Sequence, residues 1–174
     1  MASKITPANL RVTVTETISL NGNALGGTNT LNLSGITNVN KCIVDCLHSA
    51  ETALVGFVGG IEGDLAKSYA AGQFDQDNVK YFRITNLDDA NYVLLTFRNS
   101  GSTNAAETAI KLDAGCTFIY GVGITGAVVG TERTMTSLNA AISVATDTNL
   151  NNLIDVVGIA NTATVNLEIF VASI

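Results

Sequence analysis

Three cysteines and one histidine are the residues of this chain best suited to metal binding or nucleophilic chemistry. Cys42, Cys46 and His48 lie in one short run. On a strand the two thiols would stand about 13 Å apart along one face, which is too far to share a metal ion. On a helix they would be adjacent, but further ligands would have to come from elsewhere. We therefore predict ordinary reduced thiols here, a small core residue at Cys116, and no metal site.

Because His48 is the single histidine, any Ser-His-Asp or Cys-His mechanism would have to use it. Cys46 would share its strand face, which makes the pair geometrically conceivable. However, no serine lies in the glycine pattern of a nucleophile elbow, and nothing nearby indicates an oxyanion hole. The sequence predicts a protein that is not an enzyme.

Carboxylates occur in two close pairs, and both pairs fall in expected loops. Asp88 and Asp89 follow a strand-like run, where aspartate usually shapes a turn. Asp75, Asp77 and Asn78 offer oxygen ligands for a weak calcium site, but the loop lacks the fuller ligand set that calcium requires. We predict no metal ion or cofactor at either pair.

Gly121-Val122-Gly123-Ile124-Thr125-Gly126 matches the GxGxxG pattern of dinucleotide-binding proteins, with Asp147 at a suitable distance for a ribose contact. The pattern has this meaning only where a helix follows it. Here a β-branched run with a further glycine follows, and the chain contains 16 glycines. We interpret this segment as a loop between strands.

Composition favours one globular domain over residues 1–174, because 47% of the residues are hydrophobic and only 14% are charged. The net charge of −6 and the scattered basic residues argue against nucleic acid as a partner. No apolar run resembles a signal peptide or a membrane span, so we expect synthesis in the cytoplasm and no membrane contact. Residues 1–9 are expected to form a loose N-terminal arm.

Short runs of alternating or β-branched residues separated by turn residues predict an all-β fold. About eight to ten short antiparallel strands are expected, the spacing of a β-sandwich. In the final strand we expect the odd-numbered residues Val165 to Val171 to share one face, and we expect this strand to form a hairpin with the run that begins at Leu153. The clearest strand-like runs are Leu10 to Leu20, Val79 to Thr85, Tyr92 to Arg98, Thr108 to Leu112, Cys116 to Tyr120, Leu153 to Ala160 and Thr164 to Ile174.

Two segments are harder to interpret. Lys41 to Val58 fits either a helix or two strands with a turn near Ser49-Ala50-Glu51, and its β-branched residues favour the strands. Glu62 to Gly72 fits one or two helical turns that end at the glycine. Residues 36–40 are expected to be a bridge between strands.

Four segments resemble small structural proteins of tailed bacteriophages: Tyr81 to Leu87, Asn91 to Leu95, Ile110 to Ile119, and the closing residues 153–174. In that family a strand ending in an "ITN" turn leads to a second strand and then to a "KLxAGxxF" hairpin. The resemblance covers roughly the C-terminal two thirds of the chain. The resemblance implies no catalytic residue at any position of this chain.

The resemblance implies a single-domain, jelly-roll-like β-sandwich with a structural role in the virion. A capsid decoration or cement protein that binds and stabilises the major capsid protein lattice is the first expectation. Such proteins commonly form trimers, so a homotrimer is expected. A tail or neck component, or a carbohydrate-binding module, remains the alternative.

Overall fold

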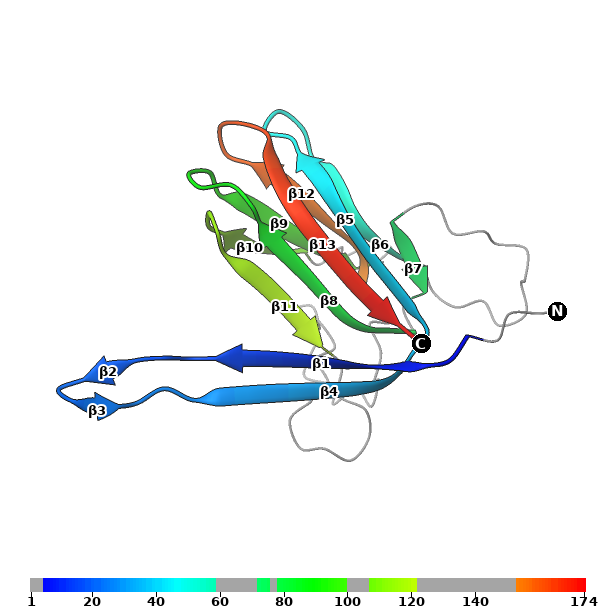
Figure 1. Ribbon diagram of the computed structural model, residues 1–174. Helices are drawn as coiled ribbons and strands as arrows, with labels where there is room; N and C mark the ends of the chain where they lie inside the picture. The colour runs from blue at the N-terminus through cyan, green and yellow to red at the C-terminus, as the bar shows by residue number, and fades with distance from the viewer. Residues whose placement is uncertain (1–4, 59–71, 76–77, 100–106, 122–152) are drawn as a thin grey trace, which may run out of the picture.

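The computed structural model describes residues 5–58, 72–75, 78–99, 107–121 and 153–174, and every structural statement below concerns these ranges (Figure 1). They contain thirteen strands and no helix. The strands are β1 (Ala8–Thr15), β2 (Ser19–Leu20), β3 (Asn23–Ala24), β4 (Thr28–Ile36), β5 (Asn38–Cys46), β6 (Thr52–Val58), β7 (Gln73–Asp75), β8 (Val79–Asn86), β9 (Val93–Asn99), β10 (Glu107–Leu112), β11 (Thr117–Gly121), β12 (Leu153–Ala160) and β13 (Val165–Ser173).

Two sheets pack face to face as a β-sandwich. One has four strands in the order β11-β8-β13-β5, and the other has five in the order β10-β9-β12-β6-β7. Neighbouring strands are antiparallel except β6 and β7, which are parallel. The expected all-β sandwich is therefore confirmed.

The core lies between the sheets because their strands alternate apolar and polar side chains. In β13 the odd-numbered residues from Val165 to Val171 share one face, as the sequence predicts, and this face is buried, while Asn166 is exposed. Aromatic rings join the two layers: Phe97 of one sheet lies 5.0 Å from Phe118 of the other, and Phe57 lies 5.8 Å from Phe82. Each large apolar side chain buried in this way contributes about 1.5–3 kcal/mol.

Four short connections at one end of the sandwich cross from one sheet to the other. They are residues 47–51, 87–92, 113–116 and 161–164, and we call this region the arch end. The strands on either side of each connection therefore pack across the core and do not pair with each other. The prediction of a hairpin between the run from Leu153 and the last strand is wrong, and so is the prediction of a hairpin between Ile110 and Ile119. Instead β12 pairs with β9 and β6, and β13 pairs with β5 and β8.

A buried asparagine holds the arch end together. Asn86, only 1% exposed, donates its side-chain amide to the carbonyl oxygens of Asn91 at 2.8 Å and Leu112 at 3.3 Å. Its side-chain oxygen accepts the Asp88 N–H at 3.0 Å, and its backbone N–H donates to Cys116 at 2.9 Å. The side chain of Asn86 thus connects the arch of residues 87–92 to the end of β10, and its backbone N–H adds the arch of residues 113–116.

The chain from Ala8 to Ile36 forms a separate two-stranded ribbon, the arm, which projects from the opposite end of the sandwich (Figure 1). The pairing of β1 with β4 continues through two backbone hydrogen bonds between Glu16 and Gly27, at 2.8 and 3.1 Å, to β2 and β3. Asn21 and Gly22 close the ribbon with φ of 52° and 79°, the signature of a two-residue type I′ turn. At the usual rise of ~3.3 Å per residue the arm is about 40 Å long.

The base of the arm is fixed to the sandwich by an apolar cluster. Leu33 and Ile36 of the arm are buried together with Tyr81 and Ala172 on the outer face of the four-stranded sheet. The Tyr81 ring packs edge-on against Phe170, with 5.8 Å between ring centroids. An isolated two-stranded hairpin is only marginally stable in water, so these contacts stabilise the proximal half of the arm. Partly buried Leu10, Val12 and Leu31 complete the cluster.

Other expectations have mixed outcomes. Lys41 to Val58 is confirmed as strand, turn and strand, and the helical alternative is wrong. Residues 36–40 are no bridge, because β4 extends to Ile36 and β5 begins at Asn38. β1 begins at Ala8, so the last residues of the expected loose arm 1–9 belong to a sheet. The helical turns expected at Glu62 to Gly72 lie outside the described residues, apart from Gly72.

We predict that Asn86→Ala lowers the free energy of unfolding by about 2–4 kcal/mol, since buried carbonyl and N–H groups lose their partner. Urea denaturation followed by circular dichroism measures the change. Asn166→Ala is the matched control, because that asparagine is exposed on the same sheet. Equal denaturation midpoints for the two variants would contradict the role given to Asn86.

Candidate interaction surface

The structure does not gather the cysteines and the histidine into a reactive cluster. All three cysteines are free; Cys46 is buried in the core, whereas Cys42 and Cys116 are exposed. Burial raises the pKa of the Cys46 thiol above its ordinary value of 9.0, which makes the reactive thiolate scarcer. His48 lies exposed in the connection between β5 and β6. The expected core position of Cys116 is wrong, because this residue lies exposed just before β11.

The acidic residues act on the backbone of their own turns. The Asp88 carboxylate accepts the N–H groups of Asn91 at 2.6 Å and Ala90 at 2.8 Å, and these bonds lower its pKa below the ordinary 3.8. At the other loop, the Asn78 side chain donates to Asp75 at 3.1 Å. Asp77 lies outside the described residues, as do Asp147 and all of the glycine motif except Gly121.

Within the described ranges no three His, Cys, Asp or Glu residues come together in a way that could hold a metal ion. A search of the same ranges for a helix long and apolar enough to span a membrane finds none.

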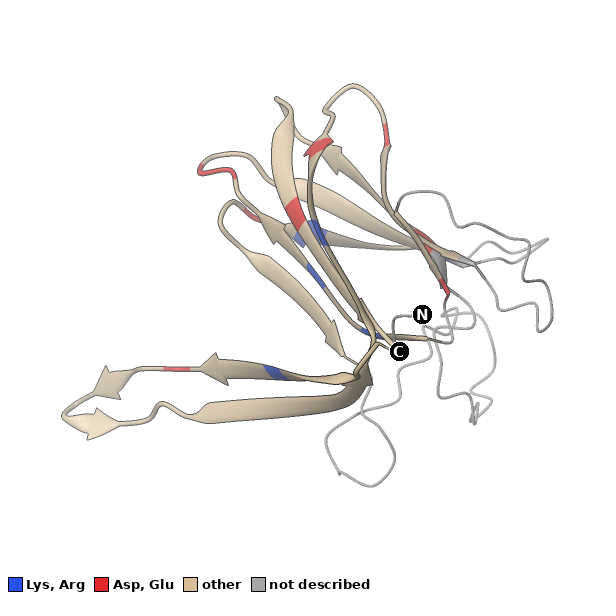
Figure 2. Ribbon diagram, turned by 45° about the vertical axis from the view of Figure 1, so that its right-hand side comes forward, with Lys and Arg blue, Asp and Glu red and all other residues tan. Residues whose placement is uncertain are grey.

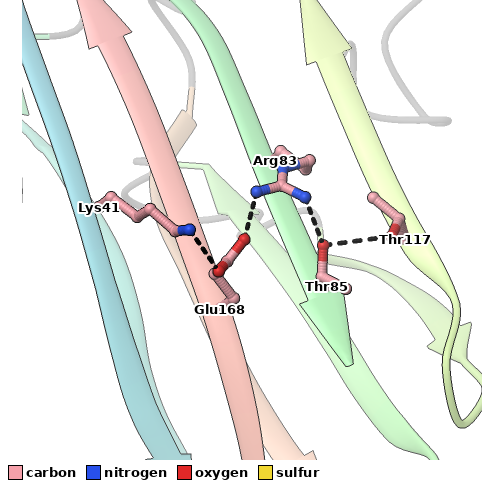
Figure 3. Close-up of polar contacts among 5 residues, drawn as sticks. All are labelled: Lys41, Arg83, Thr85, Thr117 and Glu168. Carbon is pink, nitrogen blue, oxygen red and sulfur yellow. Dashed lines mark hydrogen bonds and ion pairs between the residues drawn. The ribbon is translucent and has the colours of Figure 1, made fainter. Parts of the chain in front are cut away.

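The outer face of the four-stranded sheet carries a polar network that crosses all four strands (Figure 3). Glu168 of β13 accepts hydrogen bonds from Lys41 of β5 at 2.8 Å and from Arg83 of β8. Arg83 also donates to Thr85 at 3.2 Å, and Thr117 of β11 donates to Thr85 at 3.1 Å. Cross-strand pairs of this kind stabilise a sheet and its register. We therefore assign this network a structural role.

The hydrogen bond from Lys41, together with that from Arg83, lowers the pKa of Glu168 below its ordinary value of 4.5. The carboxylate is thus favoured in its charged form in the folded protein.

An ion pair lies on the other sheet, where Arg98 donates two hydrogen bonds to the carboxylate of Asp155, at 2.6 and 2.7 Å.

The arm presents two contrasting faces. One is lined by threonines that approach each other across the ribbon: Thr13 and Thr30 hydroxyls are 3.4 Å apart, and Thr28 donates to Thr15 at 3.5 Å. Pairing places the apolar side chains together on the other face. This apolar stripe runs from Leu10, Val12, Leu31 and Leu33 at the base to Val14, Ile18, Leu20 and Leu25 toward the tip.

Only the basal half of the apolar stripe is covered. Leu33 is buried at the base, whereas Val14, Ile18, Leu20 and Leu25 are 48% to 60% exposed. The arm contains two charged residues, Arg11 and Glu16, of which only Glu16 is in the stripe (Figure 2). An exposed and nearly uncharged apolar stripe is typical of a protein-binding surface.

An open groove of about 320 Å³ lies where the arm leaves the sandwich. It is bounded by the arm on one side and by the end of β11 on the other, and none of the described residues that line it is charged. These residues are Val12, Val14, Asn29, Thr30, Leu31, Ile119 and Gly121.

The sequence contained signals for this surface. Alternation from Leu10 to Leu20 indicated one apolar and one threonine-rich face, and Asn21-Gly22 is a strong two-residue hairpin signal. What the sequence did not indicate is that the ribbon stands away from the sandwich, because a strand inside a sheet has the same alternation.

Comparisons with protein-family models, with curated proteins and with solved structures give no match to this chain.

We predict that Glu168→Gln loses stability relative to the wild type at neutral pH and that the difference narrows as the pH falls. A carboxylate whose pKa is lower in the folded state stabilises that state above its unfolded pKa, here near 4.5, and this contribution disappears as the pH falls through the folded value. Urea denaturation of both proteins at pH values from 7 to about 3 measures this difference in the free energy of unfolding.

Asp89→Asn removes an exposed carboxylate away from the network and the arm, and controls for the altered net charge. A stability difference between Glu168→Gln and the wild type that stays constant over this pH range would contradict the predicted effect.

Proposed function

We propose that this chain is a structural protein of a tailed-phage virion, namely a capsid decoration protein that binds and stabilises the lattice of the major capsid protein. It would be made in the host cytoplasm, assemble as a homotrimer and have no catalytic role. Its partners would be the major capsid protein of the same virion and further copies of itself.

The observation that carries the proposal is the arm. A firmly packed sandwich projects a ribbon about 40 Å long by strand rise, and the outer half of its apolar stripe is exposed. Such an element reaches beyond its own domain, which suits a protein that connects neighbours in an array. With few charges along the ribbon, little desolvation of ionic groups would oppose its burial.

The segments that carry the resemblance to phage structural proteins give a second line of support. Asn86, the asparagine of the "ITN" turn, is the buried residue that connects two arches. Gly115 of the "KLxAGxxF" segment donates its N–H to the carbonyl of Asp88 at 3.0 Å. In this chain the segments that carry the resemblance thus meet in one packed corner of the sandwich.

The proposal is tested by incubating the purified wild-type chain with undecorated heads of the phage that encodes it, followed by sedimentation. We expect saturable binding with a fixed number of copies per head, and heads that resist heat or low ionic strength better once decorated. Heads of an unrelated phage serve as the control.

A chain that stays in the supernatant with its own heads would overturn the decoration role. Binding to purified tails instead would indicate a tail or neck component, and selective binding on a glycan array would indicate a carbohydrate-binding module.

A further inference from the structure

The uncovered outer half of the arm and the groove at its base are complementary surfaces on the same molecule. The tip residues Ile18, Leu20 and Leu25 are apolar and exposed, and the groove beside Val12 and Ile119 is uncharged and open. The stripe on the arm is continuous with the cluster that already packs against the sandwich through Tyr81, Phe170 and Ala172. Beyond its base, the arm therefore presents the same kind of apolar surface that packs against the four-stranded sheet at the base.

The tip cannot reach the groove of its own chain. Leu20 lies six residues beyond Val14 along a continuously paired ribbon, a separation of about 20 Å at the usual rise per residue. Closing that distance would require the ribbon to fold back and break its ladder of hydrogen bonds. A second copy of the chain offers the same groove without that cost.

We propose that the tip of the arm binds in the groove at the arm base of another copy, so that copies of this chain assemble by arm exchange. This inference deepens the assembly role proposed above and names the partner of the arm as the chain itself. Uncharged apolar side chains would enter an uncharged groove, so no ionic group on either tip or groove needs to be desolvated.

The position of Glu16 selects the symmetry of the assembly. In a reciprocal two-fold pair, with each Leu20 beside the partner's Val12, the two stripes would lie antiparallel. Glu16 is midway between these residues and would then face Glu16 of the partner. Like charges brought together at an interface disfavour this pair. A head-to-tail arrangement, in which each tip binds the groove of the next copy, avoids this contact and joins more than two copies, as a ring where the rotation between copies closes and as an open chain where it does not.

Light scattering on the free protein, in the absence of phage heads, gives the first test. We expect a mass corresponding to three or more copies of the 18.1 kDa chain. Leu20→Asp/Leu25→Asp should reduce it to the mass of one chain at concentrations where the wild type is fully assembled. Thr17→Asp/Thr28→Asp adds the same charge on the threonine face and should leave the assembly intact.

Disulfide trapping gives the second test. In a Cys42→Ser/Cys116→Ser background, a tagged chain with Leu20→Cys is mixed with an untagged chain with Ile119→Cys and mildly oxidised. We expect a tagged–untagged species, because a disulfide requires Cα atoms within about 7 Å and the two positions cannot meet within one chain. Thr15→Cys, on the other face, replaces Leu20→Cys as the control and should give no such species.

A monomeric or dimeric wild type, or an assembly whose mass is unchanged by Leu20→Asp/Leu25→Asp, would overturn the arm-exchange proposal. Wild-type protein that is monomeric yet binds its own heads would overturn arm exchange and leave the decoration role standing. An arm-exchanged assembly that does not bind heads would overturn the decoration role and leave arm exchange standing.

Discussion

The buried amide of Asn86 is the interaction on which the arrangement of the sandwich depends. Four connections at one end of the fold cross between the sheets, and the polar backbone of such arches has to be paired inside the protein. The Asn86 side chain donates to two carbonyl oxygens and accepts one N–H, which uses most of its hydrogen-bonding capacity. Apolar packing provides most of the stability, but the asparagine determines how the arches fit against each other.

At the opposite end the constraint is different, because none of the described elements covers the arm beyond its base. Tyr81, Phe170 and Ala172 cover the proximal part of its apolar stripe. Farther out, the ribbon's own ladder and the type I′ turn at Asn21-Gly22 are the interactions that the described residues provide. A two-stranded ribbon gains little stability by itself when its apolar face is exposed. This exposed face is the feature from which the assembly proposal starts.

The few charged groups of this chain include a network on the outer face of the four-stranded sheet. Glu168 lies between Lys41 and Arg83, so one carboxylate neutralises charge on two neighbouring strands. On the other sheet Arg98 and Asp155 form a second cross-strand pair. These charged pairs thus stabilise the sandwich itself, whereas the described residues of the arm tip and of the groove are uncharged. The ionic contacts between strands and the exposed apolar side chains of the arm therefore occupy separate parts of the described structure.

The sequence by itself determined the all-β class and the position of most strands in the sandwich, because these depend on local alternation and on turn residues. It placed Val165 to Val171 in a strand whose odd-numbered residues share one face, and it favoured strands over a helix between Lys41 and Val58, but it missed the strand residues between Ile36 and Asn40. Only the tertiary structure decided which strands pair: the runs around Asp113-Ala114-Gly115 and Asn161-Thr162-Ala163 have the composition of hairpins but form arches. A short polar turn permits either outcome, and the choice depends on long-range contacts such as those of Asn86. The projection of the arm was decided in the same way, because covered and uncovered ribbons have the same alternation and differ only in what packs against them.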